Sequence, residues 1–428
     1  MKKTILWLVS LTLGAFGLQG QDSITILQAG KMIDVEKGSI VNDVAIWLRG
    51  DTIIDITKWK DFPDTVKVID LKEYTVLPGL IDCHTHVCLQ ADLEANYNTW
   101  SFPVPAFGII GATNAEKNLL AGFTTIRDVH GVFYGDVAVR DAINYGWIPG
   151  PRMYVSGPGL TITGGHGSWG NWAGPQYTIK TFAHSVADGE EEVRKATREH
   201  IKFRVDLIKI IATGGVYTEG SEPGAASYTL EEIKAAVDEA RKRNIKVAAH
   251  AHGTEGIKNA IRAGVSSIEH GSYLDDEAIA MMKSKGIWLV PDILAAKWDI
   301  LHEAENEIGK DLMAKIKKVY DPFIRSFRMA YKGGVKIAFG TDAGVYPHGK
   351  NAQQFKLMVN EGMTNIDAIQ SATTSAAELI GIGNKAGRIK KGYWADIIAV
   401  KGNPLQDISI LENVKFVMKA GVVYKNEN

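Results

Sequence analysis

The sequence Gly79-Leu80-Ile81-Asp82-Cys83-His84-Thr85-His86 decides the fold. It begins with apolar residues typical of a buried strand and ends in two histidines separated by one residue. Because side chains alternate along a strand with a period of two, His84 and His86 share one face, where two imidazoles can converge on a metal ion. A His-x-His pair alone is more often exposed or hydrogen bonded than metal-bound, so its meaning depends on the rest of the chain.

Apolar strands separated by helical stretches of ten or more residues follow this motif, which is the pattern of βαβ units and a parallel sheet. One helical stretch, 230–243, begins after a capping box of Thr229 and Glu232. Eight such units in succession favour an α/β fold of the (β/α)8 barrel type over a doubly wound sheet. The predicted strands are 80–87, 124–129, 152–156, 207–212, 246–250, 267–270, 287–292 and 336–340.

Both ends of the chain are rich in short strand signals. We expect the two ends to form one small discontinuous β-sandwich domain beside the barrel. The strand signals lie at 24–27, 44–48, 53–56, 394–400 and 414–424. The predicted domains are the composite β-sandwich of 21–75 and 385–428, and the barrel of 76–384.

Composition excludes several classes of protein. With 48 Lys+Arg, 49 Asp+Glu and no basic tract, the 428-residue chain lacks the positive field of a nucleic-acid binder. Two cysteines, Cys83 and Cys88, cannot make a disulfide framework. Residues 1–20 join Lys2 and Lys3 to an apolar run and small residues, which predicts a secretory signal peptide rather than a buried helix. We therefore expect an exported protein, periplasmic or secreted, with no membrane attachment after signal removal.

Polar residues stand at the carboxyl ends of further predicted strands. Lys209 interrupts the apolar run 207–211, and a buried ammonium must reach solvent, pair or lose its charge. Each such residue alone could be a satisfied core group, but the carboxyl ends of barrel strands meet at one face, where active sites are built. The others are His250 and His252 after the fifth strand, His270 after the sixth and Asp342 after the eighth.

This set of residues resembles the amidohydrolase superfamily. The residues that match its binuclear metal site in order and spacing are His84, His86, Lys209, His250, His270 and Asp342. Within it, the chain is similar to the imidazolonepropionase-related group, which contains Xaa-Pro dipeptidases, Xaa-Arg/Lys carboxypeptidases and ochratoxinase. The motifs that carry the match are 163–167, 212–217, 249–253, 340–349, 392–397, 403–405 and 421–424.

The resemblance implies two divalent metal ions at these six ligands, and imidazole with carboxylate and carbamate suits Zn2+ best. CO2 would convert Lys209 into an anionic carbamate that bridges the metals, which removes the cost of a buried cation. A hydroxide bridging the metals would attack the amide carbonyl, and Asp342 would carry its proton to the leaving nitrogen. His252 shares a face with His250, and only the resemblance selects His250 as the ligand.

The predicted substrate contacts are His166, Tyr217, His252 and His348. His166 and Tyr217 match positions that bind the free carboxylate of the departing amino acid in related peptidases, and both side chains can donate to an anion. The alternative is a plain glycine-rich turn at 164–167 and a packed aromatic at Tyr217.

Several neighbouring residues have open roles. Trp169 and Trp172 could form the wall of a pocket for a bulky group. His130 stands where relatives often have glycine, so the sequence does not predict which substrate side chain the site prefers. We expect the remaining histidines to lie at the surface. They are His184, His200 and His302.

The predicted function is hydrolysis of the amide bond to a C-terminal amino acid in a dipeptide or N-acyl amino acid, with an ochratoxin-type amide in that range. A cyclic amide or lactone hydrolase with the same metals is the nearest alternative. A catalytically inactive ligand-binding barrel is the alternative of another class. The expected partner is a small substrate with a free carboxylate, and a homo-oligomer is expected.

Overall fold

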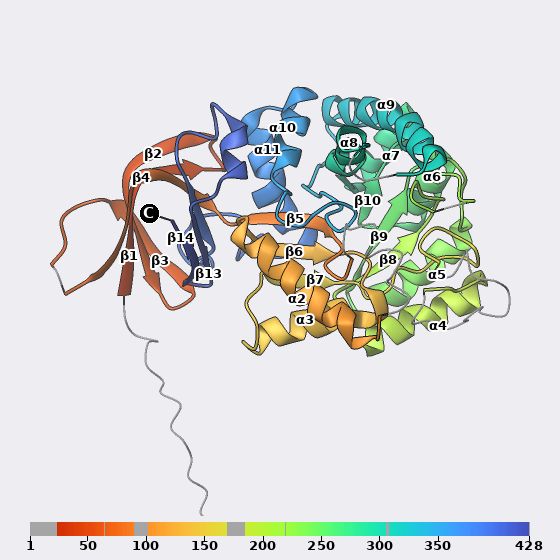
Figure 1. Cartoon of the computed structure of the whole chain (residues 1–428), viewed down its shortest axis with the longest axis horizontal. Coiled ribbons are helices and arrows are strands. Elements are labelled where there is room, and N and C mark those ends of the chain that lie inside the picture. Colours follow the sequence, from red (N-terminus) through yellow and green to blue (C-terminus); the bar gives the residue numbers. More distant parts are fainter. Residues whose placement is uncertain are drawn as a thin grey trace, which may run out of the picture.

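The computed structural model describes residues 24–63, 65–89, 102–168, 185–218, 220–304 and 308–427. The strands form three hydrogen-bonded sheets, and helices surround the two that carry the predicted site (Figure 1). The proposed signal peptide at 1–20, Trp169, Trp172 and His184 lie outside the described residues. Within the described ranges, no helix has the length and apolar character needed to cross a membrane.

The first sheet has seven strands and joins both ends of the chain. β12 pairs antiparallel with β4, which places the strands in the order β14-β13-β12-β4-β1-β2-β3. The predicted strand at 414–424 is two strands, because Ala420 and Gly421 adopt the positive φ of a tight hairpin turn. The strands are β1 (Ile24–Asp34), β2 (Ser39–Arg49), β3 (Thr52–Lys58), β4 (Lys67–Pro78), β12 (Ile397–Val400), β13 (Phe416–Lys419) and β14 (Val422–Asn426).

This sheet curls so that β3 meets the segment before β12. The Ile53 amide donates to the Tyr393 carbonyl at 2.9 Å, and the Ala395 amide donates to the Asp51 carbonyl at 2.7 Å. The enclosed side chains form their own apolar core, which includes Leu27, Ile46, Leu71, Ile397 and Phe416.

Two parallel sheets hold the polar strand ends. One has three strands and the other has four, and their bounds agree within a few residues with seven of the predicted strands. The three-stranded sheet contains β5 (Leu80–Thr85), β6 (Phe123–Asp128) and β7 (Arg152–Val155). The four-stranded sheet contains β8 (Leu207–Ile211), β9 (Lys246–Ala251), β10 (Ser267–His270) and β11 (Trp288–Val290).

The predicted eighth strand at 336–340 differs, because only Ile337 forms a bridge, to Leu289. The segment still lies between the two parallel sheets: the Leu289 amide donates to the Lys336 carbonyl and the Cys83 amide to the Phe339 carbonyl, both at 2.8 Å. The Phe339 amide instead donates to the Ser371 carbonyl at 2.9 Å, which interrupts the ladder.

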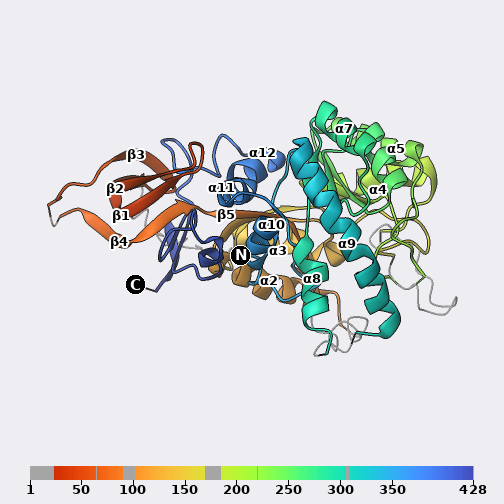
Figure 2. The same cartoon turned by 90° about the horizontal axis from the view of Figure 1, so that it is seen from above.

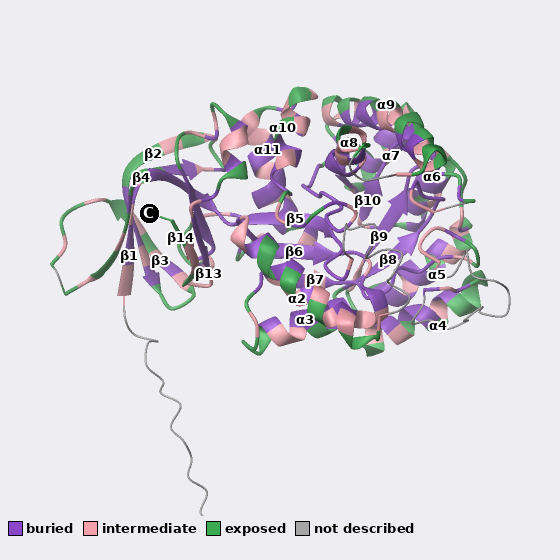
Figure 3. Ribbon diagram, viewed as in Figure 1, coloured by how far each residue is buried: buried purple, intermediate pink, exposed green. Residues whose placement is uncertain are grey.

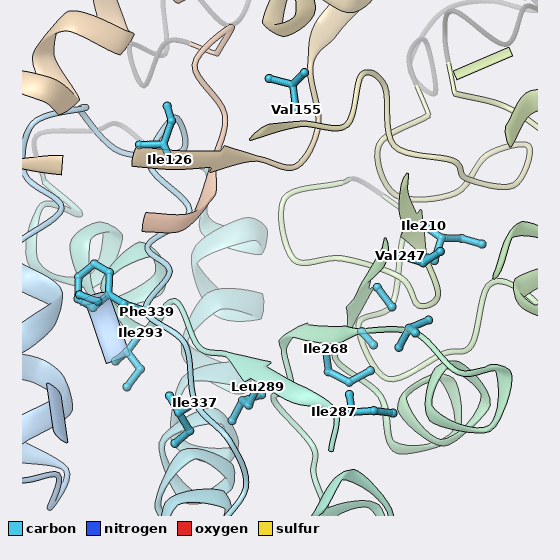
Figure 4. Close-up of a cluster of buried hydrophobic side chains, with 14 of the residues drawn as sticks. Ile126, Val155, Ile210, Val247, Ile268, Ile287, Leu289, Ile293, Ile337 and Phe339 are labelled. Carbon is cyan, nitrogen blue, oxygen red and sulfur yellow. The ribbon is translucent and has the colours of Figure 1, made fainter. Parts of the chain in front are cut away.

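Helices alternate with these strands and cover them, so that buried strands lie inside a partly exposed helical layer (Figure 3). The strand residues Ile126, Ile210 and Ile268 share one buried apolar cluster with Ile293 of a covering helix (Figure 4). The helices are α2 (Pro105–Leu120), α3 (Gly135–Asn144), α4 (Gly189–Lys202), α5 (Leu230–Arg241), α6 (Thr254–Ala263), α7 (Asp276–Lys285), α8 (Ile293–Leu301), α9 (Lys310–Gly333), α10 (Gln353–Asn360), α11 (Asn365–Gln370) and α12 (Ala376–Ile380).

Arg152 of β7 links the parallel sheets to the seven-stranded sheet. Its Nη1 lies 2.7 Å from Asp396 Oδ2, and its guanidinium stacks 3.8 Å above the Trp394 ring. The other Asp396 oxygen accepts a hydrogen bond from the Ala420 amide at 2.8 Å. One carboxylate therefore satisfies donors from both parts of the chain.

The change Asp396→Ala should lower the Tm. Asp396 is only 5% exposed, and its loss leaves the two donors without their acceptor, at a cost of about 1–3 kcal/mol. Thermal denaturation measures the effect. Glu412→Ala, which removes an exposed acid from the same C-terminal segment, is the control and should leave the Tm unchanged. Equal Tm values for the two variants would contradict a stabilising role for this junction.

Candidate active site

The polar strand ends meet at one cavity of about 220 Å3. All six predicted metal ligands line it, as do three of the four predicted substrate contacts. The ligands are His84, His86, Lys209, His250, His270 and Asp342, and the substrate contacts are His166, Tyr217 and His252. The cavity thus gathers residues from four strands, from the loops that follow β7 and β8, and from the segment after 336–340.

Two histidines are held by buried carboxylates, of which Asp292 lines the cavity and Glu269 does not. His84 Nδ1 lies 3.0 Å from Glu269 Oε2, and His270 Nδ1 lies 2.5 Å from Asp292 Oδ2. An ionised carboxylate only accepts hydrogen bonds, so these nitrogens carry the protons and each Nε2 presents a lone pair. This is the tautomer that a metal-binding histidine needs.

His250 and His270 point their inner nitrogens at each other. His250 Nε2 lies 3.2 Å from the Gly214 carbonyl, which fixes the proton there and leaves a lone pair on Nδ1. His250 Nδ1 lies only 2.8 Å from His270 Nε2. This is a hydrogen-bond distance, and the raised pKa of His270 fits a proton between the two nitrogens. A metal ion bound by both nitrogens would take the place of that proton.

Asp342 lies against His84 of β5 and against His86, which follows the strand directly. Its Oδ1 is 2.8 Å from His86 Nε2 and 3.4 Å from His84 Nε2. Burial alone would raise the pKa of Asp342, but the neighbouring imidazoles hold it well below its usual range. His86 Nδ1 is buried and has no hydrogen-bond partner among the described residues.

The backbone is strained at two of these positions. His270 has a φ of 66° and Asp342 a φ of 61°, in the left-handed region that side chains other than glycine rarely adopt. Such strain gathers at functional sites, where the surrounding structure over-determines the conformation. The fold therefore holds both side chains inward at a cost.

Lys209 of β8 is 2% exposed and lines the same cavity. Burial lowers the pKa of its ammonium to about 8. Lys209 thus gives up its proton far more readily than a surface lysine, because a buried ammonium lacks the hydration that stabilises its charge.

Possible metal-binding atoms form two groups, each within 4.8 Å, that share His270; they contain four of the five predicted histidine and aspartate ligands and leave out His86. Imidazole and carboxylate donors in such groups fit a divalent transition metal, which agrees with the unpartnered Nδ1 of His86. One group is His84, His270, Asp292 and Asp342, and the other is His250, His252 and His270.

Asp292, Glu269 and Arg127 also belong to this site, although they were not predicted from the sequence. Arg127 Nη2 lies 2.8 Å from both Glu269 oxygens, so the carboxylate that orients His84 is itself held by a buried guanidinium. Acidic residues inside or at the end of apolar strands were the available signal, because a buried carboxylate needs a partner.

The predicted substrate contacts have partners of their own. His166 Nδ1 lies 2.7 Å from Thr218 Oγ1, and burial lowers the pKa of His166 to about 3, so this imidazole is neutral. The Tyr217 hydroxyl donates to Asp299 Oδ2 of α8 at 2.7 Å. His252 Nδ1 lies 2.7 Å from Ser272 Oγ.

His348 lies behind the cavity instead of lining it. Its Nδ1 faces the Asn118 amide nitrogen at 3.0 Å and therefore accepts, so Nε2 donates to the His86 carbonyl at 3.2 Å. His348 thus supports the end of β5. His130 does line the cavity, and its Nδ1 accepts from the Gly159 amide at 2.8 Å.

The expected surface position of His200 is wrong. His200 is 0% exposed, and its ring nitrogens lie 2.6 Å from the Pro158 carbonyl and 2.9 Å from the Ala196 carbonyl. These carbonyl contacts replace the water that the ring would meet at the surface. His302 is half-buried and stacks on Trp298 with the ring centroids 4.1 Å apart.

Comparisons with known proteins agree with this geometry. A model of the Amidohydrolase family matches residues 75–424. Ochratoxinase from Aspergillus niger is 34% identical over 435 aligned residues, covering 94% of this chain and 87% of its own. A solved Xaa-Pro dipeptidase with methionine in its active site is 39% identical, with a TM-score of 0.89 and coverage of 94% and 100%. A solved prolidase complexed with N-methylphosphonate-L-proline is 32% identical, with a TM-score of 0.86 and the same coverage.

The change Glu269→Gln should weaken metal binding. Glutamine can still accept from His84 but removes the charge that pairs with Arg127, and loss of such an outer partner typically costs about 10–100-fold in metal affinity. Competition with a chromogenic chelator measures the affinity. Glu239→Gln is the matched control, since Glu239 is a 4% exposed acid on α5 that pairs with Arg194 and Arg198 outside the cavity. An unchanged affinity in folded Glu269→Gln would refute the orienting role.

Proposed function

This chain belongs to the Amidohydrolase family and is a hydrolase of amide bonds, and from that premise we propose that it releases the C-terminal amino acid from a dipeptide or N-acyl amino acid. The convergence of histidine and aspartate ligands on one cavity that also holds a buried lysine carries the proposal. Relatives named as a Xaa-Pro dipeptidase, a prolidase and an ochratoxinase support an amide substrate. Their named ligands, methionine and a proline derivative, support a substrate that ends in an amino acid.

The ligand types support two divalent metal ions, with Zn2+ the best match. When bound, such ions polarise the amide carbonyl and lower the pKa of water. Neutral Lys209 can add CO2 at Nζ and lose a proton, and the resulting carbamate would supply an anionic ligand. The residues that would hold the metals are His84, His86, Lys209, His250, His270 and Asp342.

Asp342 is the candidate proton carrier. Its carboxylate contacts both His84 and His86, and its low pKa keeps it ionised, so it can accept the proton of the attacking water. The same oxygen then donates to the departing amide nitrogen, which leaves as an amine. The proton taken from water thus ends on the leaving amine, and Asp342 is ionised again at the end of the turnover.

The free carboxylate of the substrate would lie near His166 and Tyr217. If the Thr218 hydroxyl donates to His166 Nδ1, the proton of this neutral ring is on Nε2 and can be donated to the carboxylate. Tyr217 already gives its hydroxyl proton to Asp299, so it would have to exchange that partner to bind the substrate.

We also propose an architecture for the chain and a cellular location for the protein. Parallel bridges of Leu160 with Ile210, Leu289 with Ile337 and Thr85 with Ala343 support one (β/α)8 barrel over 76–384. The curled seven-stranded sheet supports a composite β-sandwich domain of 21–75 and 385–428. The lysines and apolar run of 1–20 support export to the periplasm or medium, and a homo-oligomer remains part of the proposal.

A library of dipeptides and N-acyl amino acids should release free amino acid, whereas matched C-terminal amides should react at least about 100-fold more slowly, because a site built around a carboxylate is left unpaired. Amino-acid analysis measures the release. Metal removal by chelation should abolish it, and added Zn2+ should restore it. Equal rates on the amides would refute the carboxylate requirement, and activity confined to cyclic amides or lactones would favour that alternative.

Lys209→Ala should lower kcat/KM at least about 1,000-fold, because the metals supply several kcal/mol of transition-state stabilisation. Formate, acetate or propionate should partly restore metal content and activity by supplying the missing anionic ligand. Lys202→Ala removes an exposed lysine of α4 and should behave as the unaltered protein. Full activity of Lys209→Ala without added carboxylate would refute the bridging role.

A further inference from the structure

One wall of the cavity is apolar and belongs to two helices. Ile316, Val319 and Phe323 lie at positions i, i+3 and i+7 of α9, which places them on one helix face. They line the cavity together with Ala295 and Ala296 of α8. Ile316, Val319 and Phe323 are 0%, 3% and 4% exposed. α8 and α9 pack against each other above the ends of the parallel strands (Figures 1 and 2).

The wall is continuous with the loop that follows β8. Val216 of this loop shares an apolar cluster with Ile316 and Val319, and Tyr217 packs against the same cluster. Lys315 reinforces the contact, because its Nζ donates to the Thr218 carbonyl at 2.9 Å and to the Ser221 carbonyl at 2.7 Å.

A second hydrogen bond fixes the loop from α8. The Tyr217 hydroxyl donates to Asp299 at 2.7 Å. The side chains proposed to meet the substrate carboxylate therefore adjoin the apolar wall directly.

We propose that this wall receives the side chain of the departing amino acid and selects apolar residues there. The inference rests on the proposed function, in which the substrate carboxylate lies near His166 and Tyr217. In the departing amino acid the carboxylate and the side chain are bonded to the same α-carbon. A substrate carboxylate at Tyr217 therefore places that side chain on the adjoining surface of Val216, Ile316 and Val319. The scissile carbonyl must reach the metal ligands, which directs the acyl group away from the wall.

The chemistry of the wall then sets the selection. Apolar side chains gain from leaving water in this pocket, whereas an ammonium or carboxylate would lose its hydration without a compensating charge from these side chains. The cavity, at about 220 Å3, is below the roughly 300–1,000 Å3 of drug-sized ligand pockets and suits a small substrate.

The test uses Ala-X dipeptides and N-acetyl-X amino acids, all with a free carboxylate, in which X is Leu, Met, Phe, Lys or Glu. We expect kcat/KM for Leu, Met and Phe to exceed that for Lys and Glu at least about tenfold, as apolar pockets discriminate by 10–200-fold even for small changes. A second series keeps X as Leu and varies the acyl residue over the same side chains. We expect a weaker dependence in that series.

Two variants of the wall should shift the preference in different ways. Val319→Asp places a carboxylate in the wall and should raise the Lys to Leu ratio of kcat/KM at least about tenfold. Ile316→Ala widens the wall and should raise the Phe to Leu ratio of kcat/KM, which keeps the test valid if the buried aspartate prevents folding. Met313→Ala is the matched control, because Met313 lies in the same apolar cluster but does not line the cavity. It should leave both ratios unchanged.

The outcomes separate this inference from the function on which it rests. Hydrolysis of all the free acids with Lys and Leu within about threefold would overturn the inference and leave the proposed function standing. The inference would also fall if the acyl series gave the stronger dependence, or if folded wall variants kept the original ratios. Failure to hydrolyse any member of the series would overturn the proposed function, and the inference with it.

Discussion

The contact of Asp342 with His84 and His86 joins the end of β5 to the segment that follows α9, and both fold and site depend on it. The Asp342 amide donates to the His84 carbonyl at 2.8 Å, while its side chain meets His84 and His86. Asp82, two residues before His84, accepts from Thr341 Oγ1 at 2.6 Å. The left-handed backbone of Asp342 follows from these contacts, because backbone and side chain must both turn toward β5.

Burial of the site prepares its histidines to act as ligands. A histidine binds a metal only when it is neutral, and burial holds the pKa values of His84, His250 and His252 well below the usual range. His270 differs, since burial alone would lower its pKa but the adjoining Asp292 carboxylate raises it. Desolvation thus keeps most of these histidines neutral. The buried acids Glu269 and Asp292 orient His84 and His270 so that Nε2 faces the cavity.

Sequence patterns predicted that these side chains converge on one cavity, because strand ends and a period of two fix where they point. The partners Glu269, Arg127 and Asp292 depend on which strands become neighbours, so no local pattern pairs them. His200 is different: it follows Val193, Ala196 and Thr197 at helical spacing, and all four lie on the buried face of α4. Its position was therefore predictable from periodicity, whereas the interrupted ladder at Phe339 depends on a distant carbonyl of Ser371.

The proposed metal chemistry and the proposed selection of the departing side chain belong to different elements of the fold. The candidate metal ligands stand at or just after strand ends and in the segment after α9, where His84 contacts both Asp342 and His270. The apolar wall belongs to α8 and α9. It lines the same cavity and is continuous with the loop after β8. Tyr217 is the point of coupling, since its ring lines the cavity and its hydroxyl is held by Asp299 of α8. A movement of α8 would therefore reach two parts of the cavity: the proposed carboxylate contact through Asp299, and His270 through Asp292, which is the N-cap residue of the helix.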